Sequence, residues 1–489
     1  MTRGATRRAT AAGLRPVGAA ASRHQAGTRD RRPGGMRRLR LGEALIDIGS
    51  ITPDQLARAL ALQATEAARL GEILRLRGLV TDAEIARALA HQSGLELVDL
   101  ERVAPDPSIV ALADPAAAAR LQAIPVTREG DTLVVAAAHA DVTGLPGALG
   151  LPPGPFRLAI APQDQIERAL HRHFGAALAR RAAEAVPEAL SCRGFGVPGK
   201  RMVAVWPLGL ALLAVLAWPA TIFTALFAAA AVLAFASAAL RLVSLLGMLR
   251  GPGPGPGTTT EDAGRRPLPV ISVLVPLFRE GDILPSLIGR LGALDYPPEL
   301  ADVCLVVEAV DTATLDALRA AALPRNFRVI VVPDGLPRTK PRALNYALNF
   351  CRGEIIGIYD AEDAPEPAQL RKVAAAFAAG PARLGCVQGR LGFYNASRNW
   401  LTRCFALEYA TWFGIVLTGL SRLGLALPLG GTTCFIRRDA LEAVGAWDAH
   451  NVTEDADLGL RLARKGWQTR VLDIHTGEEA VADPVTWVR

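Results

Sequence analysis

The sequence predicts an α/β protein: a small module of helical repeats and α/β structure, a two-helix transmembrane hairpin, and a domain built on a mainly parallel sheet. Three observations support this prediction. A 24-residue pattern occurs twice, at 40–63 and 69–92, and a 48-residue apolar stretch at 202–249 contains one charge, Arg241. From residue 269 onward, short apolar runs alternate with helical patterns, which is typical of a parallel sheet with crossover helices.

The basic charge of the chain is concentrated at its N-terminus. The 489 residues carry a net charge of +7, but the first 40 contain eleven Arg and one acid, so the remainder is slightly acidic. Residues 1–35 have few apolar side chains to bury and are predicted to be a disordered basic tail. A nucleic-acid-binding or lipid-binding arm is one interpretation, and a true start at Met36 is another. No nucleic acid is expected as a partner of the folded part.

The two copies of the repeat align without a gap, with 13 of 24 positions identical. The copies, "RLGEALIDIGSITPDQLARALALQ" and "RLGEILRLRGLVTDAEIARALAHQ", each predict a short helix, a Gly stop, a Thr cap and a second helix. Apolar positions at helical spacing explain most of the match. They do not explain why Arg-Leu-Gly and the closing Gln recur at identical offsets.

Both copies fit the pattern RLGxxLxxxGxxxxxxLxxxLxxQ, with Ile85 where the pattern has Leu. They resemble the tandem motif of the MshEN domain, the N-terminal module of type II secretion and type IV pilus assembly ATPases, which binds cyclic di-GMP. Residues 36–175 would form this module. The resemblance implies that the following residues contact cyclic di-GMP: Arg40, Leu41, Gly42, Leu45, Gly49, Leu56, Leu60, Gln63, Arg69, Leu70, Gly71, Leu74, Gly78, Ile85, Leu89 and Gln92.

The apolar stretch 202–249 has room for two membrane-spanning helices, near 203–222 and 225–247, with a turn close to Trp218. Basic residues flank both ends, which places both flanks on the cytoplasmic side of a bacterial inner membrane. The N-terminal and catalytic domains would then both be cytoplasmic, and membrane lipids would be partners. A buried helical hairpin of a soluble protein is the alternative.

Linkers are predicted on both sides of the membrane segment, at 176–201 and 250–268. The first ends in "GFGVPGKR", which has the Gly and Lys spacing of a Walker A motif. Arg201 stands where that motif needs Ser or Thr for Mg²⁺, and no apolar strand precedes it, so an ATPase is rejected. The second contains "GPGPGPG", which no regular element can use.

Residues 269–489 are predicted to form the sheet domain. The apolar runs "VISVLVPL", "DVCLVVEAV", "FRVIVVP" and "EIIGIYDA" are expected strands, separated by helices near 283–294, 312–322 and 341–351. Ligands of such sheets bind at the carboxyl ends of the strands. Polar residues follow these four ends: Glu280, Asp311, Lys340 and the cluster at Asp360.

The cluster "YDAEDAPEP" crowds several acids together. Neighbouring carboxylates repel one another unless positive charge lies between them, so a divalent cation is one explanation. A solvated loop whose acids cap the next helix is the other.

Six segments resemble family 2 glycosyltransferases, the inverting GT-A group that includes cellulose and other β-glycan synthases. In the family's order they are "VLVPLFREGD", "EAVD", "KPRALN", "YDAEDAPEP", "LGGTTCFIRRDAL" and "VTEDADLGLRLARKGW". The resemblance implies that Asp360 and Glu362 form the DxD motif, which holds Mg²⁺ or Mn²⁺ against the diphosphate of a nucleotide sugar. Glu280 and Asp311 would contact the base and ribose, and Lys340 the donor.

The same resemblance makes Asp455, in the TED motif, the general base that deprotonates the acceptor hydroxyl. Capping of the following helix by Asn451 and Glu454 is the structural alternative. Processive members carry QxxRW beyond TED, followed by more membrane helices. The chain stops at "DPVTWVR", about where that motif should begin, which suggests a truncated product.

These observations favour a membrane glycosyltransferase that extends a β-glycan, in exopolysaccharide synthesis, under cyclic di-GMP control. A non-processive transferase acting on a lipid or a carrier is the first alternative. A membrane-anchored cyclic di-GMP sensor with an inactive transferase half is the second.

Overall fold

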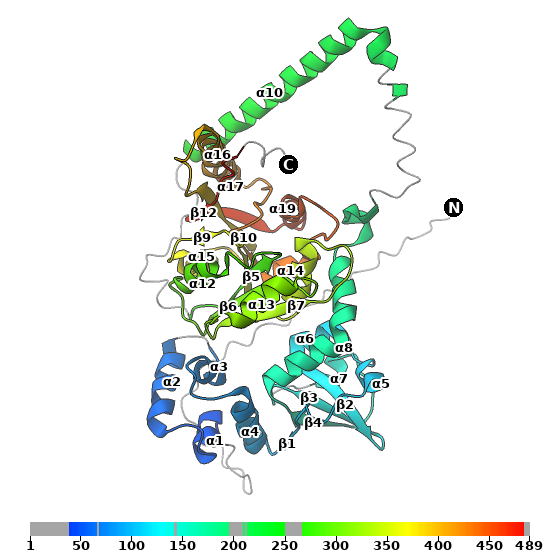
Figure 1. Cartoon of the computed structure of the whole chain (residues 1–489), viewed down its shortest axis with the longest axis vertical. Helices are drawn as coiled ribbons and strands as arrows, with labels where there is room; N and C mark the ends of the chain where they lie inside the picture. Colours follow the sequence, from blue (N-terminus) through cyan, green and yellow to red (C-terminus); the bar gives the residue numbers. More distant parts are fainter. Residues whose placement is uncertain are drawn as a thin grey trace, which may run out of the picture. The chain divides into compact units, whose positions relative to one another are not determined.

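The computed structural model describes residues 39–65, 68–140, 144–194, 209–210, 213–249 and 267–483 (Figure 1). The predicted tail and the last six residues of the chain lie outside these ranges. So do both Gly/Pro-rich segments, apart from Gly194.

The N-terminal repeat folds as two helix pairs, as predicted. Each short helix is followed by a glycine in the left-handed region, Gly49 at φ +74° and Gly78 at φ +73°. Thr81 caps the last helix, because its Oγ1 accepts from the Glu84 N–H at 3.2 Å while the Glu84 carboxylate accepts from the Thr81 N–H. The four helices are α1 (Leu41–Asp47), α2 (Pro53–Thr65), α3 (Leu70–Leu76) and α4 (Asp82–Ser93).

A small sheet of order β1-β4-β3-β2 completes this part of the chain, and we call residues 39–194 the N-terminal module. The long helix α8 packs Ile166, Leu170 and Phe174 into the core beside this sheet. The elements are β1 (Glu96–Leu97), α5 (Pro107–Val110), α6 (Pro115–Leu121), β2 (Ala123–Glu129), β3 (Thr132–Ala137), α7 (Leu145–Ala148), β4 (Phe156–Ile160), α8 (Gln163–Ala183), η1 (Glu188–Leu190) and η2 (Cys192–Gly194).

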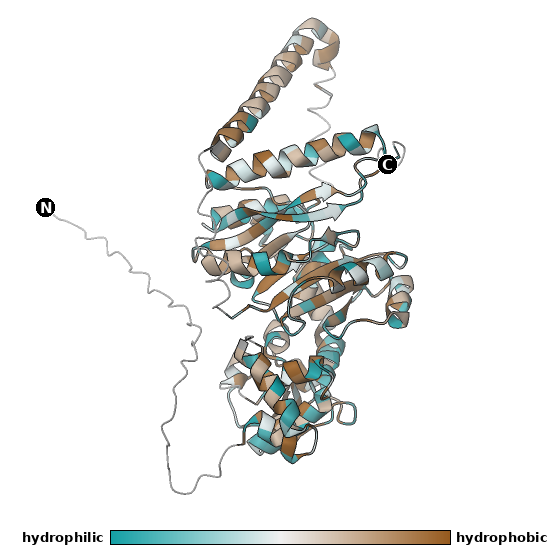
Figure 2. Cartoon of the chain, turned by 90° about the vertical axis from the view of Figure 1, so that its left-hand side faces the viewer, coloured by the Kyte–Doolittle hydropathy of each residue, from teal (hydrophilic) through white to brown (hydrophobic). Residues whose placement is uncertain are grey.

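Most of the described part of the apolar stretch forms one long helix, α10 (Pro219–Leu249), which Figure 2 shows as hydrophobic along most of its length. It is long and apolar enough to cross a membrane. The predicted first helix, near 203–222, lies partly outside the described residues. In the described part the chain is helical at 213–217 and breaks at Trp218, so the next helix begins at Pro219 and not near 225.

A second helical segment, Trp400–Arg422, also has the length and apolarity of a membrane span. It lies inside the sheet domain and was not predicted. It consists of α16 (Trp400–Thr411), a π-helical turn η3 (Trp412–Leu417) and α17 (Thr418–Arg422).

The sheet domain, residues 267–483, is built on one eight-stranded sheet of order β7-β6-β5-β8-β11-β10-β12-β9. The four predicted strands are confirmed as the parallel half, with β5 between β6 and β8. The α/β class with a mainly parallel sheet is therefore confirmed. The strands are β5 (Ile271–Leu277), β6 (Ala301–Glu308), β7 (Phe327–Val332), β8 (Ile355–Ile358), β9 (Ala364–Pro365), β10 (Leu384–Phe393), β11 (Cys434–Arg437) and β12 (Gln468–Glu478).

Helices connect the parallel strands, as predicted. The most enclosed is α14, whose residues Pro341–Leu348 are all buried because the sheet lies on one side and α8 of the N-terminal module on the other. The helices of the sheet domain other than α16 and α17 are α12 (Leu284–Gly292), α13 (Thr312–Ala320), α14 (Lys340–Leu348), α15 (Gln369–Ala379), α18 (Arg438–Ala443) and α19 (Glu454–Arg464).

The C-terminal end of α10 docks on α17 through small residues. A Cβ atom on Gly419 would lie 2.2 Å from the Ser244 carbonyl oxygen, so the two backbones touch at this point. The Arg422 guanidinium closes the contact by donating to the Met248 carbonyl at 2.6 Å. The apolar helix is thereby attached directly to the sheet domain.

We predict that Gly419→Ala destabilises the purified chain by about 1–3 kcal/mol, because the added methyl group has no space against α10. Gly414→Ala is the matched control, since a Cβ atom there meets nothing within 4 Å. Thermal unfolding of both variants in detergent checks this. Equal unfolding temperatures for the two would contradict the close crossing.

Candidate active site

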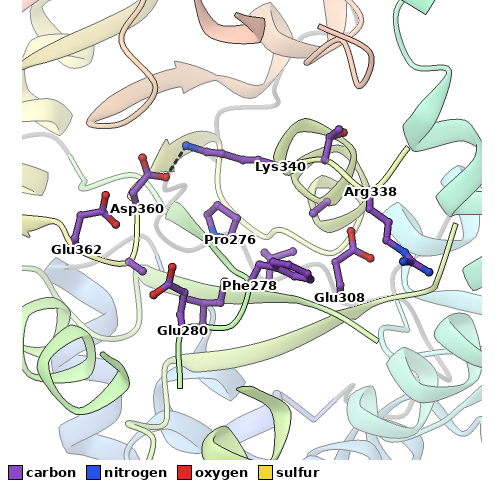
Figure 3. Close-up of a pocket in the computed structure, with 13 residues that line it drawn as sticks. Pro276, Phe278, Glu280, Glu308, Arg338, Lys340, Asp360 and Glu362 are labelled. Atoms are coloured by element: carbon purple, nitrogen blue, oxygen red, sulfur yellow. Dashed lines mark hydrogen bonds and ion pairs between the residues drawn. The ribbon is translucent and has the colours of Figure 1, made fainter. Parts of the chain in front are cut away.

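The carboxyl ends of β5, β6 and β8 and the start of α14 enclose a cavity of about 280 Å³ (Figure 3), which we call the sheet-edge pocket. It lies where parallel strands leave backbone and side-chain groups free for a ligand. Its lining residues are Pro276, Leu277, Phe278, Glu280, Val306, Glu308, Arg338, Thr339, Lys340, Ala343, Asp360, Ala361 and Glu362.

Lys340 and Asp360 form an ion pair inside this pocket. Lys340 Nζ lies 2.5 Å from Asp360 Oδ1 and donates also to the Gly431 carbonyl at 2.9 Å. Burial alone would lower the pKa of Lys340, but the attraction of Asp360 outweighs it, and the pKa is raised. The lysine therefore stays charged and brings positive charge to the acidic end of β8.

The acids near this pair are unfavourably placed with respect to one another. Burial raises the pKa of Glu280, and repulsion from Glu362 raises it further. Burial also raises the pKa of Asp363 to about 7. Asp363 accepts from the Asp360 N–H at 2.8 Å and from the Thr432 hydroxyl, so it braces the loop, and its Oδ1 is buried without a hydrogen-bond partner in the described part of the chain.

The oxygen ligands of the pocket suit a hard divalent cation such as Mg²⁺ or Mn²⁺. Asp360 and Glu362 point into the cavity (Figure 3), and a cation between them would relieve the repulsion that they and Glu280 experience. Within the described ranges, no group of three acids, His or Cys lies close enough to hold an ion unaided. The residues therefore fit a cation whose other ligands come from a bound molecule.

Asp455 lies beside Lys340, in the first turn of α19. A Cβ atom on Gly431 would lie 3.2 Å from Asp455 Oδ2 and 3.9 Å from Lys340 Nζ, so both side chains approach the same glycine. Burial raises the pKa of Asp455 to about 7, with a further contribution from repulsion by Glu454. A carboxyl group that titrates near neutral pH can take a proton from a hydroxyl group.

Asp311 lies outside the sheet-edge pocket, unlike Glu280, Lys340, Asp360 and Glu362. It caps α13 by accepting from the Thr314 N–H at 3.2 Å, and it accepts from the Arg279 N–H at 2.5 Å. It is buried and does not line the sheet-edge pocket. Glu308, three residues earlier, does line it and pairs with the buried Arg342 at 2.6 Å. Sequence reasoning missed Glu308, which is the last residue of β6 but lies inside the apolar run "DVCLVVEAV".

Glu478 is a second residue that sequence reasoning missed. Burial raises its pKa to about 8, and repulsion from Asp363, Asp360 and Glu362 adds to the shift. It ends β12, which pairs with β9 directly after the acidic cluster. No local pattern in "TGEEA" indicates this position, because it depends on pairing between distant strands.

A second cavity, which we call the repeat pocket, lies in the N-terminal module. Arg69 enters it and pairs with His139, with 2.9 Å between Arg69 NH1 and His139 Nε2. Burial lowers the pKa of His139 to about 4, so the ring is neutral and can accept from the guanidinium. The pocket is lined by Leu41, Arg69, Gly71, Glu72, Arg75, Asp82, Ile85, Ala86, Leu89, Ala138, His139, Ala161 and Gln163.

The other predicted ligand contacts do not line the repeat pocket, and several of them have structural roles. Leu45 and Leu74 are fully buried. Gly42 allows close packing, since a Cβ atom there would lie 2.4 Å from Leu56 Cδ1. Gln63 donates to the Ala68 carbonyl at 3.2 Å. The remaining motif residues outside the pocket are Arg40, Gly49, Leu56, Leu60, Leu70, Gly78 and Gln92.

We predict that Asp455→Asn stabilises the chain at pH 8, because the wild type must ionise a half-buried carboxyl group whose pKa is about 7 instead of 3.8. The folded wild type holds this proton longer than the unfolded chain, so its stability falls as pH rises from about 4 to about 7. The variant should gain on the order of 2–4 kcal/mol at pH 8 and nothing at pH 4. Urea unfolding at both pH values checks this, and an equal gain at both would contradict the burial of Asp455.

Two family models match the chain. One, described as "Glycosyltransferase like family 2", matches residues 268–476, and the other, described as the MshEN domain, matches residues 93–180. The second match begins where the second copy of the repeat ends.

Curated relatives resemble the sheet domain. The beta-monoglucosyldiacylglycerol synthase of Synechocystis sp. is 31% identical over 242 residues, which is 48% of this chain and 48% of the relative. Cellulose synthase 1 catalytic subunit [UDP-forming] of Komagataeibacter xylinus is 28% identical over 214 residues, which is 42% of this chain and 27% of the relative. The chain spans about half the length, or less, of these relatives.

Solved structures resemble both parts. A structure of MshE with cdg is 33% identical and covers 28% of this chain and 99% of that chain, with a TM-score of 0.26. The mannosyltransferase PcManGT from Pyrobaculum calidifontis, in complex with GDP-Man and Mn²⁺, is 21% identical and covers 51% of this chain and 69% of that chain, with a TM-score of 0.38. Together with the family models, the geometry described above leads to one assignment: the chain contains a family 2-like glycosyltransferase domain preceded by an MshEN domain.

Proposed function

We propose that the chain transfers a sugar, with inversion, from a nucleoside-diphosphate sugar to an acceptor hydroxyl group at a membrane, and that cyclic di-GMP regulates the transfer. The observation that carries the proposal is the convergence of Asp360, Glu362 and Lys340 in the sheet-edge pocket, with Asp455 beside Lys340. The match of residues 268–476 to family 2 supports it.

Each side chain then has a chemical task. Lys340 supplies positive charge where the donor diphosphate would bind, and Asp360 and Glu362 would hold the divalent cation. When bound, Mg²⁺ or Mn²⁺ stabilises the negative charge that develops on the leaving diphosphate. Asp455 removes the proton of the acceptor hydroxyl group, whose oxygen attacks the anomeric carbon as the bond to the diphosphate breaks. Direct attack gives a β-linkage from an α-linked donor.

A growing β-glycan is the acceptor that we propose first, because one relative is named cellulose synthase 1 catalytic subunit. A lipid acceptor is the second candidate, because a relative is named for glucosylating diacylglycerol. A cleft of about 710 Å³ beside α10 also favours a lipid, and Arg241, Glu408 and Trp412 are among its lining residues. Phe413, at the same cleft, packs on Gly430, next to the glycine that Lys340 and Asp455 approach.

We propose that the membrane is contacted through α10 and the segment Trp400–Arg422. Their length and apolarity support this, together with the exposure of α10 side chains such as Phe223 and Phe235. Placement of both folded domains on the cytoplasmic side of a bacterial inner membrane remains part of the proposal, because it rests on the flanking basic residues.

We predict that Asp360→Asn lowers divalent-cation-dependent turnover by about 10²–10³-fold, because the cation and Lys340 both lose their carboxylate partner. Asp363→Asn should be milder, since Asp363 braces the loop. Asp316→Asn, on the exposed face of α13, is the control. Release of UDP or GDP from nucleotide sugars, measured against Mg²⁺ and Mn²⁺, checks this, and equal losses at Asp360 and Asp363 would contradict the assigned pair.

We predict also that Arg69→Gln weakens cyclic di-GMP binding by about tenfold or more, the scale of a lost charge-assisted hydrogen bond. Arg40→Gln should weaken it less, because Arg40 does not line the repeat pocket. Calorimetry on the purified full chain measures both affinities. Unchanged affinity in Arg69→Gln, or no heat with the wild type, would count against a nucleotide site at this pocket.

A further inference from the structure

The segment from Lys340 to Asp360 forms one structural unit, in which helix α14 is followed by a turn and then by strand β8. Its two ends meet in the sheet-edge pocket, where Lys340 Nζ lies 2.5 Å from Asp360 Oδ1. The side chains between them are buried along α14 and β8, so close packing connects the turn to the pocket along the whole unit. A displacement of its turn would therefore change the position of the ion pair.

Arg352 lies in that turn, at the opposite end of the unit from the pocket. Its backbone N–H donates to Ser272 Oγ at 3.0 Å and to Asp302 Oδ2 at 3.1 Å. The next residue, Gly353, packs so closely that a Cβ atom would lie 2.3 Å from the Ser272 nitrogen. The turn is thus fixed to the starts of β5 and β6, and it presents the Arg352 guanidinium from a defined position.

The Arg352 guanidinium pairs with Glu72 of the N-terminal module and, through its Nε at 3.3 Å, with Asp302 Oδ1 of its own domain. Glu72 lines the repeat pocket, and its Oε1 also accepts from Arg75 at 2.6 Å, on the wall of the same pocket. The three side chains are at most 21% exposed, so solvent screens their charges only partly. The Glu72 carboxylate is therefore shared between Arg75 of the repeat pocket and Arg352 of the sheet domain.

The N-terminal module also holds the side of the same unit. His171 of α8 pairs with the Tyr346 hydroxyl, 2.8 Å from its Nδ1, and stacks on Phe350 at a centroid distance of 4.0 Å. Asn345 donates to the Ala182 carbonyl of α8 at 2.9 Å. These contacts hold α14 against α8 of the N-terminal module. A displacement of the turn at Arg352 would therefore move the turn relative to this contact.

We propose that Arg352 is a positioning residue for the Lys340–Asp360 pair, and that Glu72 makes this position depend on an anionic ligand in the repeat pocket. The inference rests on the proposed function. A phosphate group in the pocket attracts Arg75 away from Glu72, so Glu72 pairs with Arg352 alone. In one state Glu72 pairs with both Arg75 and Arg352, and in the other it pairs with Arg352 only. The change in the position of Arg352 shifts the buried unit, and with it the Lys340–Asp360 pair at the donor site.

The test compares Arg352→Gln with the wild-type full chain in membranes. Cyclic di-GMP affinity should stay within about threefold, because Arg352 does not line the repeat pocket. The change in donor KM and kcat on adding cyclic di-GMP should fall to less than twofold. The variant should fold, since Asp302 keeps Arg328 at 2.8 Å and Ser272 at 2.6 Å.

Two further variants make the test specific. Arg77→Gln removes the ion pair between Arg77 of the N-terminal module and Glu299 of the sheet domain, which are 2.5 Å apart. Glu299 lies outside the Lys340–Asp360 unit. Arg77→Gln should keep the wild-type response. Arg352→Lys keeps the positive charge and should restore at least half of the response that Arg352→Gln loses.

The outcomes separate this inference from the proposed function. A wild type that neither binds nor responds to cyclic di-GMP overturns the proposed regulation, and this inference with it. A wild type that responds, with Arg352→Gln responding equally, overturns only the role of Arg352. Loss of the response in Arg77→Gln, or no restoration by Arg352→Lys, would mean that Arg352→Gln acts by loosening the whole contact between the N-terminal module and the sheet domain. Either result would also overturn the role of Arg352.

Discussion

The ion pair between Lys340 and Asp360 is the interaction on which the candidate site depends. It joins the start of α14 to the end of β8, two points separated by 20 residues of chain, at a nitrogen–oxygen distance of 2.5 Å. The same Nζ donates to the carbonyl of Gly431, the glycine beside Asp455. One ammonium group thus connects the acidic cluster of β8 to the loop that faces the proposed base.

The site holds its acids at an energetic cost. Burial raises the pKa of Asp363 and Asp455 to about 7 and that of Glu478 to about 8. These carboxyl groups resist ionisation where they stand, and each ionised neighbour increases the resistance. Such an arrangement is stable only with partners of opposite charge. Lys340 is one such partner, and a divalent cation with a diphosphate would provide the rest of the balance.

Local patterns predicted what depends on local structure. Gly49 and Gly78 end the short helices, and Thr52 and Thr81 stand at the same position in the two copies of the repeat. Both helix pairs could therefore be expected. The carboxyl-end rule for parallel strands predicted that Lys340 and Asp360 lie together. The geometry of the turn after β6 was not predictable: it places Glu308 on the pocket wall and Asp311 at the cap of α13. Contact of Asp311 with the base and ribose, which the family resemblance implies, stays a prediction.

Contacts between distant segments could not be predicted from the sequence. The pairing of β12 with β9, which brings Glu478 toward the acidic cluster, joins Thr476 to Pro365, far apart in the chain. Nothing near Glu72 or Arg352 indicates that they meet. The apolar segment Trp400–Arg422 was not predicted, because it is less apolar than α10 and contains the charged residues Arg403 and Glu408.

We propose that Asp360 and Glu362 bind a cation together with a nucleoside diphosphate, since within the described residues they do not form a complete metal site. Electron paramagnetic resonance of Mn²⁺ titrated into the purified full chain, with and without UDP or GDP, tests this most directly. We expect weak Mn²⁺ binding alone and binding at least tenfold tighter with one of the nucleotides. Equal Mn²⁺ affinity in the presence and absence of both nucleotides would contradict it.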